Sequence, residues 1–320
     1  MFRARARFFA PKPKLLKRSY NSHYPPELRI PLLGPAIWSI AACSTIYLGC
    51  AAYEVYQDVR LVKSQKSRWA HKGTLQSFEE LERFRGIEVT GTTWRRPRTS
   101  TSEQPEFSGP QKLTMGIMGL NVGAHLASSM MPTGIFHLVH RPGLSGNYTL
   151  LTSVFGHAGL GHLGLNLYGM FHFIPSAAYS PTFKASNAHL TAFYLSAGIL
   201  SSLAQHVTAV WPRRTLGTSS LGASGALFAM FGIVGMSSPD TRIGIIFLPG
   251  SVPIGEAMTC IALFDAIGIF VKYPYVRLGH AAHLGGLACG VAYVKYRGDK
   301  NIWHMSRRVA FEVMRDLRLF

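Results

Sequence analysis

The chain has 320 residues, of which 48% are hydrophobic and only 15% are charged, and its mean hydropathy is +0.14. A typical soluble domain carries roughly 25% charged residues, so lipid is the expected main solvent. The net charge of +18 belongs to the ends and linkers, because residues 113–294 hold three acidic and seven basic residues. A nucleic-acid-binding protein would carry its basic residues on a folded surface, so this distribution argues against that class.

Residues 1–26 contain seven Lys or Arg and no acid, with apolar residues scattered between them. This pattern is typical of a mitochondrial transit peptide, whereas a secretory signal has a continuous apolar run directly after its charges. The triplet Arg18-Ser19-Tyr20 resembles a matrix processing site. We therefore expect residues 1–20 to be a transit peptide, with a basic arm lying on anionic lipid as the alternative.

Seven apolar stretches are candidates for helices that cross about 30 Å of hydrocarbon. The first covers 32–53, and a polar stretch at 54–112 separates it from the others. The other six cover 113–132, 162–178, 188–210, 220–237, 252–271 and 279–296. We predict an all-α polytopic membrane protein with one N-terminal transmembrane helix, a polar linker over 54–112, a six-helix core over 113–296 and a basic C-terminal tail over 297–320. This is a 1+6 arrangement.

Polar residues inside the apolar block form three clusters, each near the start of a predicted helix. They are His157 to Asn166, Leu221 to Ala226 and Gly279 to Gly290. If the spans alternate in direction, the three helices run parallel. Asn166, Ser224 and His283 are then expected at one depth, each about four residues, or roughly 6 Å, inside its helix. A hydroxyl, an imidazole and an amide at one level are the groups that acyl transfer requires.

Each cluster also has a purely structural interpretation. A Gly-Ala-Ser-Gly segment is common in transmembrane helices, where small residues permit close packing, and Asn166 would join helices by hydrogen bonds. His157 and His162 would be interfacial histidines whose polar edges reach water. In either case the last helix has a small-residue face, made of Ala282, Gly286 and Gly290.

Other membrane-protease chemistries lack their residues. No His is followed by Glu, as a His-Glu-x-x-His zinc site requires, and no carboxylate is evident beside His280 and His283, so neither a metal nor a cofactor is expected. An aspartyl protease needs two facing Asp residues, and only Asp265 lies well inside a predicted span. We expect Asp265 to be hydrogen-bonded within the bundle, with a gating or proton-linked role as the alternative. The four cysteines lie in apolar runs and predict no disulfide framework.

Together, these motifs resemble those of the rhomboid intramembrane serine proteases, in particular the mitochondrial, presenilin-associated-rhomboid-like branch of fungal type. The motifs are His-x-x-x-Asn from His162, Gly-x-Ser-Gly from Gly222 and His-x-x-Gly-x-x-x-Gly from His283. The resemblance covers roughly 113–296, and 32–53 fits the extra helix of that branch.

The resemblance implies a serine endopeptidase with Ser224 as nucleophile and His283 as general base, without an acidic third member. Asn166 and His162, with the backbone N–H of Ser224, would stabilise the oxyanion. Four glycines would support the backbone and helix packing around these residues, namely Gly222, Gly225, Gly286 and Gly290. Phe228 takes the position at which bacterial members carry a Tyr beneath the imidazole, so it is expected to stack there without offering a hydroxyl.

The resemblance also implies a location and partners. The chain would be a multi-pass protein of the mitochondrial inner membrane that cleaves transmembrane-anchored proteins, such as a dynamin-like fusion GTPase or an imported haem peroxidase. Segment 133–160 would be a loop partly in the membrane, and 245–271 a mobile side gate. The lipid bilayer is an expected partner and nucleic acid is not, while the oligomeric state is left open. Two alternatives remain: a catalytically silent relative that binds helices for quality control, and a carrier or channel.

Overall fold

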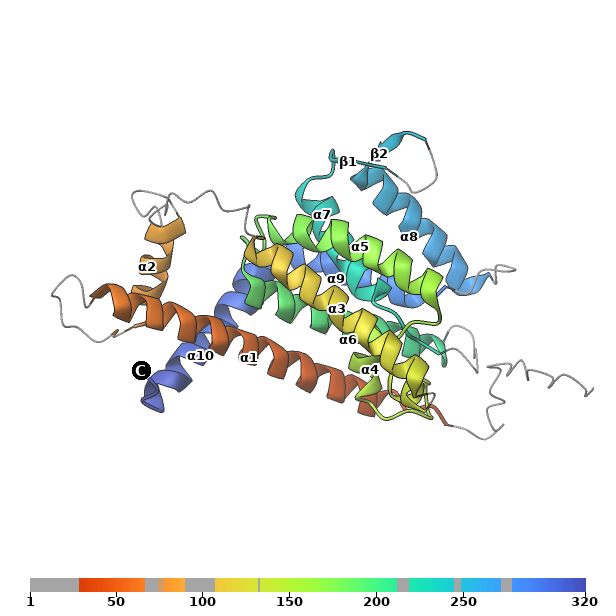
Figure 1. Ribbon diagram of the computed structural model, residues 1–320, viewed down its shortest axis with the longest axis horizontal. Coiled ribbons are helices and arrows are strands. Elements are labelled where there is room, and N and C mark those ends of the chain that lie inside the picture. Colours follow the sequence, from red (N-terminus) through yellow and green to blue (C-terminus); the bar gives the residue numbers. More distant parts are fainter. Residues whose placement is uncertain are drawn as a thin grey trace, which may run out of the picture.

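The computed structural model describes residues 29–66, 75, 77–89, 107–131, 133–211, 219–244, 249–271 and 278–320. The predicted transit peptide at 1–20 lies outside these residues. The described part folds into ten α-helices, with short 3-10 and π-helical segments and one small hairpin (Figure 1). The α-helices are α1 (Leu33–Lys66), α2 (Phe78–Val89), α3 (Gly109–Met130), α4 (Thr149–Thr152), α5 (Leu160–Ala178), α6 (Asn187–Thr208), α7 (Ser224–Ser237), α8 (Ile254–Phe270), α9 (His280–Lys295) and α10 (Met305–Asp316).

Helices occupy all seven stretches that the sequence marks as candidate spans, namely α1, α3, α5, α6, α7, α8 and α9. By length and composition, one described helix, α1 over Leu33–Ser64, is long and apolar enough to cross a membrane. The three helices α7, α8 and α9 have 14, 17 and 16 residues. A helix of 16 residues is about 24 Å long, less than the hydrocarbon thickness of roughly 30 Å. The 1+6 transmembrane arrangement therefore stays a prediction.

The hairpin before α8 departs from a purely helical structure. Strand β1 (Arg242–Gly244) pairs antiparallel with β2 (Ser251–Pro253), and Arg242 lies opposite Pro253. The side chain of Arg242 closes the pair by donating to the Ser251 hydroxyl at 2.9 Å. This exposed hairpin leads directly into α8 and lies at one edge of the molecule in Figure 1.

The helix α7 is the centre of the bundle. It packs most extensively against α9 and also contacts α5, α6 and α8. On one side α3 covers α5, and α1 runs along α6 (Figure 1). At the opposite edge α8 rests on α9 and α7. Residues on α7 and α9 are therefore held from several directions.

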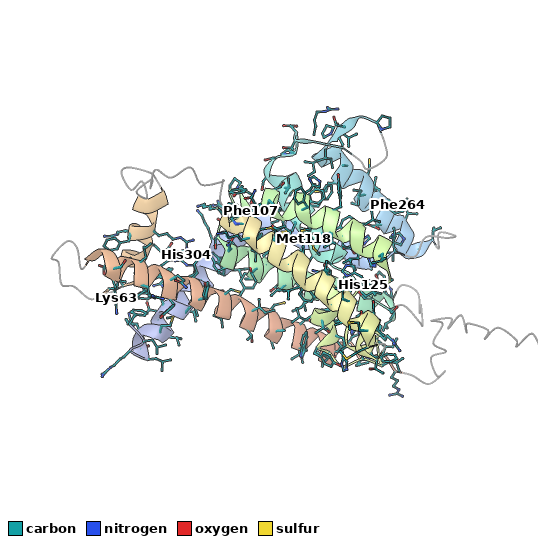
Figure 2. All side chains as sticks on the ribbon, viewed as in Figure 1. Lys63, Phe107, Met118, His125, Phe264 and His304 are labelled. Atoms are coloured by element: carbon teal, nitrogen blue, oxygen red, sulfur yellow. The ribbon has the colours of Figure 1, made fainter. Side chains whose placement is uncertain are left out.

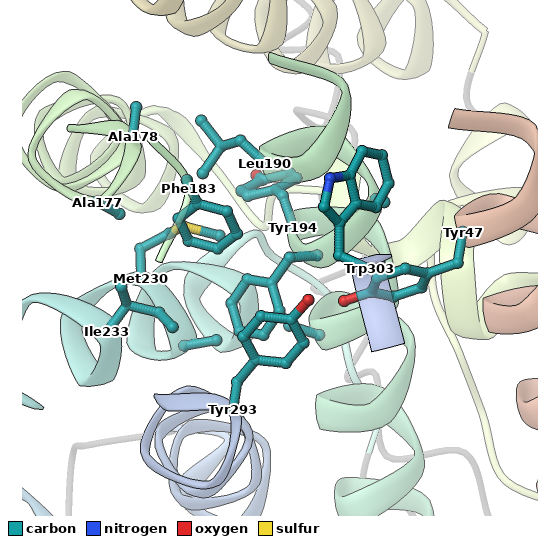
Figure 3. Packing of buried hydrophobic residues seen from close by; sticks show 14 of the residues in the cluster. Tyr47, Ala177, Ala178, Phe183, Leu190, Tyr194, Met230, Ile233, Tyr293 and Trp303 are labelled. Carbon is teal, nitrogen blue, oxygen red and sulfur yellow. The ribbon is translucent and has the colours of Figure 1, made fainter. Parts of the chain in front are cut away.

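A buried aromatic cluster joins α1, α6 and α9 to the π-helical segment Asp299–His304 (Figure 3). His189 of α6 stacks on Trp303 with ring centroids 4.6 Å apart, and its Nε2 lies 2.7 Å from the Tyr293 hydroxyl. Tyr47 of α1 meets Trp303 edge-on at 6.3 Å. Because each aromatic side chain buries a large apolar area, this cluster fixes both α1 and the last part of the chain to the bundle.

The segments 54–66 and 297–320 differ from the predicted linker and tail. The helix α1 continues to Lys66, and the last residues form the π-helical segment and α10 instead of a free basic tail. Figure 2 shows Lys63 and His304 in this protruding part. The tail was predicted from its many charged residues. That prediction overlooked a buried apolar face at helical spacing, which is made of Trp303, Ala310, Phe311 and Met314.

One buried arginine connects α10 to α1 and α2. Arg307 is 2% exposed, and its guanidinium nitrogens lie 3.0 Å from a Glu54 oxygen and 2.6 Å from an Asp58 oxygen. It also bonds the Glu82 carboxylate of α2. Arg85 of α2 adds a second cation, 2.8 Å from Glu54. The two arginines and three carboxylates of this cluster therefore partly neutralise one another.

Replacing Arg307 with alanine is expected to lower the free energy of unfolding of the unit formed by α2, α10 and the end of α1 by about 3–5 kcal/mol. The reason is that three carboxylates lose their shared buried partner. Chemical unfolding followed by intrinsic tryptophan fluorescence, and limited proteolysis of α10, measure the loss. Arg308→Ala is the matched control, since Arg308 is exposed and lies 3.6 Å from the exposed Glu79. Such surface pairs contribute little. Equal losses of unfolding free energy and equal proteolysis of α10 in the two variants would contradict this account.

Candidate active site

Ser224 is the first residue of α7, whereas the sequence places it about four residues inside a helix. The preceding residues do not extend the helix, because Gly222 has a φ of +115°, which residues with a side chain rarely adopt. Its N–H donates to the Ser153 carbonyl at 2.8 Å and holds the turn against the segment before α5. A Cβ at position 222 would also lie 2.8 Å from Cε1 of His162. Glycine is thus required here for both conformation and space.

The position of Ser224 at a helix N-terminus leaves backbone donors beside its hydroxyl. The first bond of the α7 ladder runs from the Leu227 N–H to the Ala223 carbonyl at 3.0 Å. The N–H groups of Ser224, Gly225 and Ala226 precede this bond and have no acceptor within the helix. The positive end of the helix dipole lies at the same place, so the site favours a developing negative charge.

The imidazole of His283 lies at the Ser224 hydroxyl. Its Nε2 is 2.9 Å from Oγ, a hydrogen-bonding distance for a base and a nucleophile. The Phe228 ring stacks on this imidazole, with the ring centroids 4.3 Å apart and the planes 16° apart. His283 is buried and Ser224 is half-buried. The structure therefore brings Ser224, His283 and Phe228 into one arrangement.

Close backbone contact between α7 and α9 produces this arrangement. A Cβ on Gly286 would overlap the carbonyl of Gly225, and one on Gly290 would overlap the carbonyl of Ala229. Gly225 faces α6, where a Cβ would lie 2.5 Å from the Cβ of Ser201. The small residues of the two motifs thus set the distance between the serine helix and the histidine helix.

His162 and Asn166 lie one turn apart on α5 and share a face of that helix. The His162 ring adjoins Gly222, directly before the serine turn. The side-chain amide of Asn166 is buried and donates to the His162 carbonyl at 2.8 Å, while its oxygen accepts no hydrogen bond from the described residues. No hydrogen bond in the described part of the chain joins either side chain to Ser224. Their assignment to the oxyanion stays a prediction.

His157 is 2% exposed, which contradicts its interpretation as an interfacial residue that reaches water. Its ring packs edge-on against that of His162, with centroids 5.1 Å apart. Burial, with the neighbouring His162, lowers the pKa of His157 to about 4, so its ring is neutral at neutral pH. His157 therefore forms part of the packed wall beside the serine turn.

A carboxylate lies beside His280 and His283, although the sequence shows none near them. Asp265 of α8 places Oδ1 2.6 Å from Nδ1 of His280 and 3.5 Å from Nδ1 of His283. The expectation that no carboxylate accompanies these histidines is wrong, and the expectation of a hydrogen-bonded Asp265 is confirmed. The loop between α8 and α9 conceals this proximity from motif spacing. The available signals were an acid within an apolar run and two histidines one helical turn apart.

Metal chemistry finds no matching arrangement in the ranges that the structure describes. No group of three or more His, Cys, Asp or Glu side chains there is arranged to hold a metal ion. Two imidazoles and one carboxylate do meet at Asp265, but Nε2 of His283 is directed at Ser224. Ser224 with His283, and His280 with Asp265, thus form two hydrogen-bonded pairs at the site.

The family model of the rhomboid domain matches residues 145–300. This range contains Ser224, His283, His162 and Asn166. The chain therefore carries a rhomboid domain over just under half of its length. The resemblance seen in the motifs is thereby confirmed, and the rhomboid domain together with the helical fold indicates an all-α membrane protein.

Rhomboid relatives extend the match to named proteins. The rat "Presenilin-associated rhomboid-like protein, mitochondrial" is 34% identical over 155 residues, which are 48% of this chain and 39% of the relative. "Rhomboid protein 1, mitochondrial" of Saccharomyces cerevisiae is 27% identical over 215 residues, 65% of this chain and 58% of the relative. "Rhomboid-like protein 11, chloroplastic" of Arabidopsis thaliana is 29% identical over 207 residues, 62% of this chain and 71% of the relative. The match thus spans about two fifths of the rat protein's length.

Proposed function

We propose that this rhomboid-family chain is an intramembrane serine endopeptidase of the mitochondrial inner membrane, with Ser224 as nucleophile and His283 as general base. The contact of 2.9 Å between His283 Nε2 and Ser224 Oγ carries the proposal. A serine hydroxyl is a weak nucleophile until an adjacent base accepts its proton, and this pair provides that base within hydrogen-bonding distance.

In the acylation step, Ser224 Oγ attacks the scissile carbonyl carbon and its proton moves to Nε2 of His283. The C–O bond forms as the carbonyl π electrons move to the oxygen. The N–H groups at the start of α7, with His162 and Asn166, stabilise the resulting oxyanion. His283 then returns its proton to the leaving amine, and the peptide C–N bond breaks.

In the deacylation step, water attacks the acyl-enzyme at the same carbonyl. His283 accepts a proton from the water and transfers it to Ser224 Oγ as the ester bond breaks. The stacked Phe228 ring keeps the imidazole plane in place through both steps. The products are the two fragments of the substrate and the regenerated enzyme.

The proposed substrates are proteins anchored by transmembrane helices. An intact helix conceals its scissile bonds behind backbone hydrogen bonds, so cleavage requires local unwinding, and helix-breaking residues favour it. The proposed arrangement is α1 as the extra span and α3, α5, α6, α7, α8 and α9 as the six-span core, in a multi-pass topology. Mitochondrial relatives in rat and yeast support the location.

The second candidate is a catalytically silent rhomboid protein that binds transmembrane helices for quality control. Such a protein needs the helix-binding bundle but not an aligned serine and histidine. The contact between Ser224 and His283 therefore favours the protease.

The deciding experiment is labelling of the detergent-solubilised, folded protein with a fluorophosphonate probe, which reacts with activated serines. The wild type is expected to be labelled, and Ser224→Ala and His283→Ala are expected to lose labelling. Absence of labelling in both detergent and lipid-reconstituted wild type, with an unchanged thermal unfolding transition, would support the silent helix-binding protein instead.

A further inference from the structure

A buried carboxylate lies behind the proposed base. Asp265 is 2% exposed in the interface of α8 and α9, where an acid is costly unless it is hydrogen-bonded. Its Oδ1 lies 3.5 Å from Nδ1 of His283, the ring nitrogen opposite the one that faces Ser224. His283 of α9 therefore contacts Ser224 of α7 through one ring nitrogen and Asp265 of α8 through the other.

We propose that Asp265 is a positioning residue for His283, so that the catalytic pair has an acidic partner supplied by α8. This inference rests on the proposed function of Ser224 and His283. A carboxylate only accepts hydrogen bonds, and it favours the tautomer of His283 that carries its proton on Nδ1. That tautomer leaves the Nε2 lone pair for the Ser224 hydroxyl.

The Asp265 carboxylate also stabilises His283 when the imidazole becomes positively charged. The Ser224 proton moves to Nε2 of His283 and later to the leaving amine, while Asp265 takes up no proton. During this interval the imidazolium faces a negative charge in a poorly solvated interface, where their attraction is stronger than in water. Asp265 thus stabilises the charged form of the base without touching the substrate.

His280 contacts the same carboxylate. Its Nδ1 makes the shorter contact with Asp265, at 2.6 Å, and Phe264 packs edge-on against its ring at 5.4 Å. A Cβ on Gly268 would lie 2.5 Å from ring atoms of His280, so the ring rests directly on the α8 backbone. Because His280 and His283 are one turn apart on α9, one carboxylate of α8 serves both.

A purely structural role for Asp265 makes a different prediction. In that case the carboxylate only joins α8 to α9 through His280, and removal of either partner has the same effect on the active site. Under the positioning role, loss of Asp265 affects His283 directly, whereas loss of His280 leaves the carboxylate beside His283.

The test compares Asp265→Asn with His280→Gln in the full chain, using the second-order rate constant of fluorophosphonate labelling. Asp265→Asn is expected to slow labelling by roughly tenfold to a hundredfold, because an amide at this position also donates hydrogen bonds and favours the wrong tautomer. His280→Gln is expected to lose far less, and both variants should keep the wild-type thermal unfolding midpoint within a few degrees. Equal losses in the two variants, or no loss in Asp265→Asn, would overturn the proposal.

A second measurement does not depend on the folding of a variant at position 265. Nuclear magnetic resonance of the wild type with ¹⁵N-labelled histidine reports the tautomer of His283, whose signals are identified by their loss in His283→Ala. A proton on Nδ1 is the expected result, and a proton on Nε2 would overturn the proposal. A wild type that does not react with the fluorophosphonate probe would instead refute the proposed protease function. Failure of that function and failure of the positioning role are therefore distinguishable.

Discussion

Cleavage of a transmembrane reporter by Ser224→Ala is expected to be at least about 10⁴-fold slower than by the wild type, because the covalent route is removed. His283→Ala is expected to lose a similar amount, and the double variant little more, since the two residues act as one unit. The assay uses protein reconstituted in lipid vesicles with a reporter helix that contains a glycine pair, and quantifies the two fragments.

The matched control is Ser219→Ala, because Ser219 is exposed in the segment that leads to the same turn. It should cleave at the wild-type rate. Persistent cleavage by Ser224→Ala, when Ser219→Ala and wild type behave alike, would show that another group is the nucleophile.

Replacing Gly286 with alanine is expected to abolish labelling and to lower the free energy of unfolding by about 1–3 kcal/mol or more. The new Cβ would overlap the Gly225 carbonyl, and backbone at this place cannot move without separating α7 from α9. Separation withdraws His283 from Ser224, so activity should fall even in molecules that stay folded. Thermal unfolding and probe labelling of the same samples measure the two effects.

Gly123→Ala in α3 is the control for a glycine-to-alanine change, because a Cβ there meets nothing within 4 Å. Alanine favours a helix over glycine by about 1 kcal/mol, so this variant should be as stable as the wild type or more stable. A Gly286→Ala variant that is as stable and as reactive as Gly123→Ala would refute the close-contact account.

The helices of the bundle were predictable because each one follows a continuous apolar run. The start of α7 was not, since residues 220–223 are small or apolar like those that follow, and the backbone conformation of Gly222 keeps them outside the helix. The last residues show the opposite problem. Their charges suggested a tail, although Arg307 is buried among three carboxylates that lie far from it in the sequence.

The same contrast holds for the candidate site. Motif order was sufficient to select Ser224 and His283, because the glycines around them lie at fixed spacings in the sequence. The carboxylate at Asp265 was not connected to them, since its approach depends on how α8 rests on α9. A pairing between helices of this kind leaves no fixed spacing in the chain.

The two flanks of the bundle are closed to different degrees. Along α6, the helix α1 buries Ser39, Tyr47 and Ala51 at helical spacing, while Ile37 and Ile40 face outward. On the opposite flank, α8 rests on α7 and α9. Its Phe264, labelled in Figure 2, is 42% exposed. A guest helix that enters from the lipid therefore displaces less packed surface at α8 than at α1. Under the proposed protease function, substrate entry at α8 would leave the packing of α1 on α6 intact.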